Sequence, residues 1–184
     1  MESDFKMSYF VDLREQYLSI RKSWFKNKDN VLILDTETTG FYKTDQVIEL
    51  GIIDLDGNIL FEEKFKPTVP ISIGATQAHG ITKQDLLYCS TWKDSHQRIA
   101  ALLKNKLVLA YNSNFDYRLM QQTAQAFNCQ LPYFEVQDVM KHAKVETGSK
   151  KNISLATVTG ETNQSHRAVD DCLLTLKYIK QITQ

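Results

Sequence analysis

Cysteine is scarce in this chain of 184 residues, which contains three of them. Cys89, Cys129 and Cys172 are widely spaced and form no C-x-x-C pair. An odd number of separated cysteines argues against a disulfide framework and against a zinc site. This content is typical of a reducing compartment, so we expect a cytoplasmic protein.

Glycine and proline are few as well, at 7 and 3 residues, and 22 basic residues balance 22 acidic ones. The scarcity of glycine and proline argues against linkers and disorder, and the length fits one globular domain. The balance of charge means that no overall field attracts a nucleic acid. Any such binding therefore depends on a local patch.

Long hydrophobic runs are also missing. No run approaches the length of a membrane span, and the first residues, MESDFKMSYF, carry acids where a signal peptide is basic and then apolar. We therefore expect a soluble protein that has no membrane partner.

The first part of the chain predicts an amphipathic helix at residues 7–26. Its apolar residues recur every three or four positions, so they form one stripe. They are Phe10, Leu13, Tyr17, Ile20 and Trp24. The helix either packs on the main core or serves as an arm that binds a partner. We divide the chain into an N-terminal helical extension at 1–30 and a main domain at 31–184.

The main domain begins with patterns typical of strands. Residues 31–35 (VLILD) are an apolar run, and residues 46–67 contain two runs separated by Asp56-Gly57, a strong hairpin signal. Three antiparallel strands are expected. Strands at 107–110 and 133–137 then alternate with predicted helices at 82–105, 115–128, 138–144, 153–159 and 167–182. This order indicates a mixed-sheet α/β or α+β domain with helices on its faces.

Two acids, Asp35 and Glu37, stand at the end of the first predicted strand. Side chains alternate along a strand, so these two point to the same side, with Cα atoms about 7 Å apart. Carboxylates this close repel one another, and such a pair usually shares a proton or holds a cation. Two surface acids that cap the following loop are the simpler explanation of this short pattern.

Further acids stand near the starts of two predicted helices. Asp116 follows Phe115 at a strand-to-helix junction, where α/β proteins place sites and where an acid also favours the helix dipole. His166 precedes the last helix, and Asp171 lies near the edge of its buried face. A histidine in such a position is more often a structural hydrogen-bonding group than a catalyst.

In chain order, D-x-E at 35–37, N-x-x-F-D at 112–116 and H-x-x-x-x-D at 166–171 resemble the three motifs of the DEDDh group of 3′-to-5′ exonucleases. This group includes the proofreading subunits of bacterial replicative DNA polymerases and the ribonuclease T-like enzymes. DTETTGF at 35–41 and HGIT at 79–82 are similar to the proofreading branch. Tyr111 departs from the pattern, since many relatives carry histidine there.

The resemblance implies the ribonuclease H-like exonuclease fold, an α/β fold whose mixed five-stranded sheet is flanked by helices, with the N-terminal amphipathic helix added. It implies a metal-dependent 3′-to-5′ exonuclease that hydrolyses phosphodiester bonds of single-stranded or frayed DNA and releases nucleoside 5′-monophosphates, in proofreading or repair. One alternative is an exoribonuclease for short or structured RNA ends. Another is a non-catalytic module that binds nucleic acid or protein. The implied partner is a nucleic-acid 3′ end, and a polymerase or replication protein is a candidate partner.

The resemblance also assigns residues to the site. It implies that two Mg²⁺ or Mn²⁺ ions, which suit an oxygen-rich donor set, are held by Asp35, Glu37, Asp116 and Asp171. His166 would take the proton from the attacking water. Expected contacts to the terminal nucleotide are Thr36, Thr38, Thr39, Gly40, Phe41, His79, Asn112 and Phe115. Phe41 is a candidate for stacking on a base or wedging between bases, with core packing as its alternative.

A local excess of positive charge lies between the second and third motifs. It consists of Lys141, Lys144, Lys150 and Lys151, to which His142 would add charge at lower pH. This group predicts either contact with the substrate backbone or a solvated lysine-rich loop.

Overall fold

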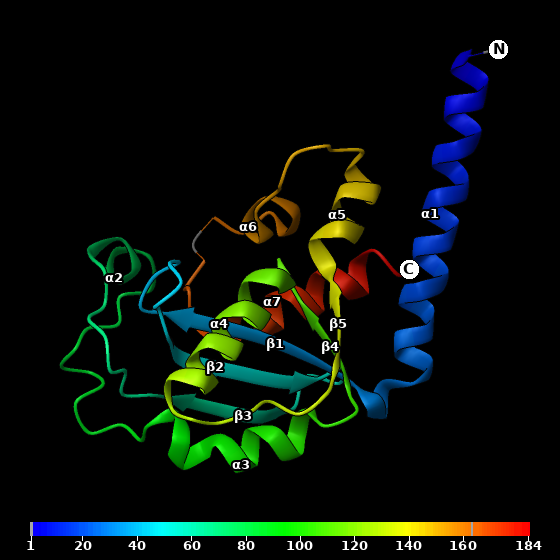
Figure 1. Cartoon of the computed structure of the whole chain (residues 1–184). Coiled ribbons are helices and arrows are strands. Elements are labelled where there is room, and N and C mark those ends of the chain that lie inside the picture. Colours follow the sequence, from blue (N-terminus) through cyan, green and yellow to red (C-terminus); the bar gives the residue numbers. More distant parts are fainter. Residues whose placement is uncertain (1, 163) are drawn as a thin grey trace.

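The computed structural model describes residues 2–162 and 164–184, with side chains from residue 11 onward except residue 163. One mixed five-stranded sheet has the order β3-β2-β1-β4-β5 (Figure 1). The strands are β1 (Val31–Thr38), β2 (Val47–Asp54), β3 (Ile59–Lys64), β4 (Leu107–Ala110) and β5 (Glu135–Asp138). The first three are antiparallel neighbours, whereas β4 is parallel to β1 and to β5. The predicted α/β fold with a mixed five-stranded sheet is confirmed.

Helices cover both faces of this sheet. They are α1 (Glu2–Lys26), the short 3-10 helix η1 (Lys28–Asn30), α2 (Ile73–His79), α3 (Trp92–Leu103), α4 (Ser113–Ala126), α5 (Val139–Thr147), α6 (Leu155–Thr159) and α7 (Ala168–Gln181). Alternation along β1 builds two cores. Leu32 and Leu34 pack with α3 and α4, while Val31 and Ile33 pack with α7, α5 and the end of α1.

One predicted helix, at 82–105, was too long. The helix starts at Trp92, after Thr91 and Asp94 form a capping box, and residues 82–90 form turns in which Asp85 accepts hydrogen bonds from Thr82. Helix α2 was missed. It has only 7 residues, and its apolar Ile73 is 79% exposed, so the sequence has no buried stripe there.

The predicted helix at the N-terminus is confirmed; it begins at Glu2, before the predicted residue 7, and lies on α5 (Figure 1). The indole of Trp24 is buried, and its Nε1 donates a hydrogen bond to Gln137 Oε1 at 2.9 Å. The first turns extend away from the rest of the molecule. Ile20 is exposed, and the predicted stripe residue Phe10 lies outside the described side chains. The end of the stripe near Trp24 is therefore part of the core. The division into an extension at 1–30 and a main domain at 31–184 stays a prediction, and residue 1 lies outside the described residues.

Candidate active site

The end of β1 carries the first two acids of the site. Asp35 and Glu37 are half-buried and lie on the same side of β1 as Ile33. In the neighbouring strand they pair with Gly51 and Glu49. Because β1 is the central strand of the sheet, side chains from the helices on either face can approach its end.

Helix α4 supplies Asp116. After β4, Asn112 adopts a left-handed backbone conformation with φ of 67°, and its N–H donates to Asp138 Oδ1 at 3.0 Å. This sharp turn starts α4, so Asp116 lies in the first helical turn and is buried. Thr36 Oγ1 donates a hydrogen bond of 2.7 Å to Asp116 Oδ1, which orients that carboxylate from β1.

Helix α7 supplies Asp171, and the segment just before it supplies His166; the helix packs closely on β2. A Cβ at Gly51 would lie 2.7 Å from the backbone of Ala168 and Val169, so only glycine allows this approach. Asp171 follows in the first turn of α7 and is buried, and Gln164 Nε2 donates to its Oδ2 at 2.8 Å.

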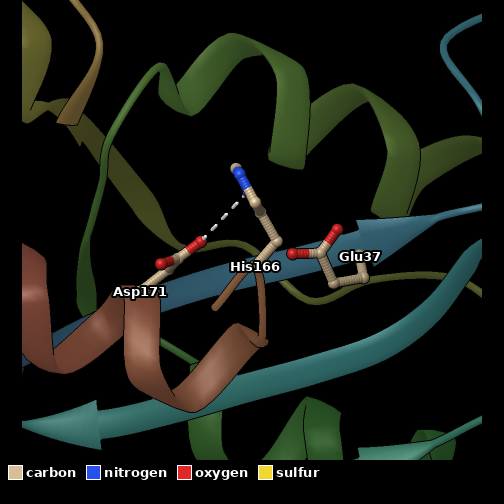
Figure 2. A group of neighbouring side chains, drawn as sticks. All are labelled: Glu37, His166 and Asp171. Carbon is tan, nitrogen blue, oxygen red and sulfur yellow. Dashed lines mark ion pairs between the residues drawn. The ribbon is translucent and has the colours of Figure 1, made fainter. Parts of the chain in front are cut away.

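The predicted histidine meets these acids. Glu37, His166 and Asp171 each place one potential ligand atom within 4.8 Å of the others, and Figure 2 shows the three side chains around one space. His166 Nδ1 lies 4.0 Å from Asp171 Oδ2, and the histidine side chain is 45% exposed. The structure thus brings a solvent-accessible imidazole beside acids from β1 and α7.

The carboxylates strongly influence one another. Burial raises the pKa of Asp35 well above its ordinary value, and the charges of Asp116, Asp171 and Glu37 add to this. Burial and the charge of Asp171 raise the pKa of Glu37 to about 8. Burial also raises the pKa of Asp116 to about 7 and raises that of Asp171. Positive charge placed among the four acids would favour their ionised forms, so this donor set fits hard divalent cations.

The loop after β1 is rigidly built. Thr39 Oγ1 and the N–H of Tyr42 donate 2.7 Å hydrogen bonds to the carboxylate of Asp45, and Gly40 packs so close to that carboxylate that a Cβ would clash. Phe41 nevertheless points outward, 66% exposed, with its ring 4.7 Å from that of Tyr42. Core packing of Phe41, one of the two alternatives, is therefore wrong.

Other residues that were predicted to contact the substrate form hydrogen bonds within the protein. His79 is buried, its Nε2 donates to the carbonyl of Thr38 at 3.1 Å, and its Nδ1 accepts from the N–H of Ile81. Thr38 Oγ1 donates to the carbonyl of Gly40. These bonds join the loop, α2 and β1. Direct contact of these residues with a nucleotide stays a prediction.

The two remaining predicted contacts belong to the α4 junction. Asn112 is exposed, while Phe115 is half-buried with the guanidinium of Arg118 5.5 Å from its ring centre. Nη2 of the same Arg118 donates to the carbonyl of Phe41 at 3.2 Å. Helix α4 therefore supports the loop that carries Phe41 in addition to supplying Asp116.

Sequence reasoning missed an ion pair that holds the start of α7. The carboxylate of Glu49 on β2 is buried and accepts hydrogen bonds from the guanidinium of Arg167, with Nε 3.0 Å from Oε2, and from the N–H of Ala168 at 3.1 Å. An acid inside the apolar run at 47–53 was the available signal. The pair fixes the backbone next to His166.

The predicted basic group is partly wrong. His142 is buried, and burial together with the charge of Arg21 lowers its pKa to about 3, so it does not gain the expected charge on mild acidification. Lys141, Lys150 and Lys151 are exposed, as expected for either explanation of the lysines.

Comparison with protein families identifies the arrangement. A model of the RNase_T family, described as exonuclease, matches residues 32–179. The chain belongs to this exonuclease family. Nucleases of the RNase_T family typically depend on divalent metal ions.

Individual proteins that are similar to this chain include other nucleases. The chain is 29% identical to an uncharacterized exonuclease, CP81, of Escherichia phage 186, covering 89% of this chain and 92% of the relative. It is also 29% identical to the DNA polymerase III subunit epsilon of Buchnera aphidicola from Acyrthosiphon pisum, covering 80% and 68%. Among solved structures, exonuclease X in complex with 5′ overhanging duplex DNA matches with a TM-score of 0.64 and 25% identity, covering 83% of this chain and 90% of that one.

The chain is therefore an RNase_T-family exonuclease with the ribonuclease H-like exonuclease fold. Within the described part of the chain, no helix is long and apolar enough to cross a membrane.

Proposed function

We propose that this RNase_T-family enzyme is a 3′-to-5′ exonuclease that removes nucleoside 5′-monophosphates from single-stranded or frayed DNA. One observation carries the proposal: four carboxylates and one histidine, from three distant segments, gather at the end of β1. Neither a capping acid nor a structural histidine accounts for such a cluster, because buried carboxylates without a counter-charge oppose folding.

The metal ligands in this proposal are Asp35, Glu37, Asp116 and Asp171. Two bound Mg²⁺ or Mn²⁺ ions would activate water and stabilise the charge that develops on the phosphate and on the departing 3′ oxygen. The hydrogen bond from Thr36 holds the Asp116 carboxylate in one orientation, and Gln164 does the same for Asp171. The oxygen donors favour hard cations over zinc.

His166 acts as the general base. Its ring is partly exposed and lies beside Asp171, so it can accept a proton from the attacking water and release it to solvent. The ion pair between Glu49 and Arg167 fixes the residue that follows His166, while the histidine itself, two residues before α7, has φ of 50°. The backbone is thus anchored while the ring stays accessible.

The end of the substrate strand meets the loop at 38–46. Phe41 and Tyr42 are exposed aromatic side chains on a loop anchored by Asp45 and Arg118, and such side chains stack on bases whatever their identity. They would hold or wedge apart the terminal bases, and this favours single-stranded and frayed ends. A DNA substrate is further supported by the relative exonuclease X, whose structure contains duplex DNA with a 5′ overhang.

The decisive test is digestion of 5′-labelled DNA and RNA oligonucleotides of the same sequence in Mg²⁺. The expected result is a ladder of DNA products shortened from the 3′ end. Asp116→Asn should abolish this ladder. Asp56 is an exposed acid of the hairpin turn, so the control Asp56→Asn should leave the ladder unchanged. Shortening of RNA alone would show an exoribonuclease instead.

Metal titration separates an enzyme from a binding module. Calorimetry with Mn²⁺ should detect sites that Asp35→Asn weakens. A folded protein that binds no Mn²⁺ and shortens neither oligonucleotide would refute the proposal.

A further inference from the structure

Helix α1 takes no part in the reaction proposed above, yet it forms one wall of a groove. The groove has a volume of about 520 Å³ and lies between α1, the start of α4, β5 and α5. Tyr17 and Ile20 line it from α1, Asn114 and Tyr117 from α4, and Lys141 from α5. Figure 1 shows α1 standing beside α5 at this end of the sheet.

Two residues that line the groove are near an acid of the candidate site in the chain. Asn114 and Tyr117 lie in the same first turns of α4 as Asp116, so they flank this carboxylate in the chain. Asp138, which also lines the groove, ends β5 and pairs with Ala110 at the end of β4. The groove therefore lies at the end of the sheet where the acids gather, and α1 lines it as well.

Aromatic side chains suited to bases line this groove. Tyr117 is 40% exposed, and its ring meets that of Phe134 edge to face with centroids 5.5 Å apart. Gln121 Nε2 donates a 2.7 Å hydrogen bond to the Tyr117 hydroxyl. The ring is therefore held in one orientation with part of its surface free. Tyr17 adds a second, half-buried ring on the opposite wall.

One exposed cationic side chain, that of Lys141, stands at the edge of the groove. Arg21 is 2% exposed and lies close enough to the lining residue His142 for its charge to act on it. Its Nη2 pairs with Glu146 at 2.6 Å, while Nε and Nη1 have no hydrogen-bond partner among the described residues. The acidic lining residue Asp138 is engaged inside the protein, because its Oδ1 accepts the backbone N–H groups of Asn112 and Met140.

We infer that this groove binds the nucleic-acid strand on the 5′ side of the nucleotide being removed, with α1 as its outer wall. The inference rests on the proposed function, because the same strand places its 3′ end at the acids. Bases stack on Tyr117 and Tyr17, and a phosphate meets Lys141. The occupant is a single strand, since stacking on these rings requires unpaired bases.

The test compares a dinucleotide with a DNA oligonucleotide of about ten nucleotides, since only the longer one can occupy both the site and the groove. Lys141→Glu should lower kcat/KM for the longer substrate about tenfold, reduce its salt dependence and leave dinucleotide cleavage unchanged. The matched control is Lys104→Glu, which changes an exposed lysine at the end of α3 that does not line the groove, and it should change neither.

Two further pairs of variants test the walls. Tyr117→Leu should reproduce the length-dependent loss while Tyr117→Phe, which keeps the aromatic face, should not. On α1, Ile20→Glu should lower kcat/KM for the longer substrate about tenfold. Ser19 is exposed on the same helix but lies outside the groove, so Ser19→Glu should leave kcat/KM unchanged. Equal effects on both lengths, or no effect on the longer substrate, would overturn the inference.

Measuring strand binding without cleavage separates the test of the groove from the test of the proposed function. Fluorescence anisotropy of a labelled oligothymidylate in EDTA should show weaker binding to Lys141→Glu and unchanged binding to Lys104→Glu. If no oligonucleotide is shortened but this difference is found, the groove stands and the enzyme proposal fails. If the wild-type chain does not bind the strand, or if Lys141→Glu binds it equally well, the groove is wrong.

Discussion

His142 should make the junction between α1 and α5 sensitive to acid. It is buried between the rings of Tyr17 and Trp24, at centroid distances of 4.5 and 4.6 Å, and its pKa is lowered from 6.5 to about 3 by burial and by Arg21. The folded chain thus keeps this imidazole neutral where the unfolded chain protonates it. Its stabilising contribution is complete above pH 6.5 and is lost as the pH falls from 6.5 towards 3.

The magnitude follows from the two pKa values. Each pH unit between them corresponds to about 1.4 kcal/mol, so at about pH 5 the free energy of unfolding should be lower by about 2 kcal/mol on account of His142. Attraction of an imidazolium to the neighbouring rings acts in the opposite direction, but the lowered pKa shows that burial outweighs it. Burial therefore decides the sign.

Urea unfolding of the wild type and of His142→Leu at about pH 7.5 and pH 5 provides the assay. The substitution has its own cost of repacking, which cancels when the change with pH is compared between the two proteins. The wild type should lose about 2 kcal/mol more than the variant on acidification. An equal loss in both proteins, or a larger loss in the variant, would refute the reasoning.

Three further predictions concern the candidate site. Thr36→Val removes the hydrogen bond to Asp116 and should lower kcat about tenfold and weaken Mn²⁺ binding in calorimetry, whereas Thr36→Ser should retain both. His166→Ala should lower turnover of a single-stranded oligonucleotide by about 10²–10⁴-fold while Mn²⁺ still binds, and unchanged turnover would exclude it as the base. Arg167→Met leaves the buried Glu49 charge without its partner, so urea unfolding should show a loss of roughly 3 kcal/mol, part of which Glu49→Gln in the same chain restores.

Local patterns predicted most of the elements. The hairpin at Asp56-Gly57 forms where expected, and the helix at 167–182 corresponds to Ala168–Gln181, because turn chemistry and apolar periodicity act over a few residues. The helix at 82–105 was predicted too long because polar residues compatible with a helix are used for turns and for the cap at Thr91.

The chain's own sequence determined which residues could do the chemistry. Asp35, Glu37, Asp116, His166 and Asp171 became candidates because their types, spacing and order resemble the DEDDh exonuclease motifs, without any coordinates. Acids at strand ends and helix starts are chemically conspicuous, since neither position needs them for packing.

Only the tertiary structure decided how these residues are supported. The partners Thr36 and Asp116 are 80 residues apart, and Glu49 and Arg167 are 118 apart, so no local pattern joins them. The burial of His142 likewise depends on α1 lying over α5. Burial and long-range hydrogen bonds arise when separate segments pack together, and packing therefore determined the charge of His142, the orientation of Asp116 and the groove beside α1.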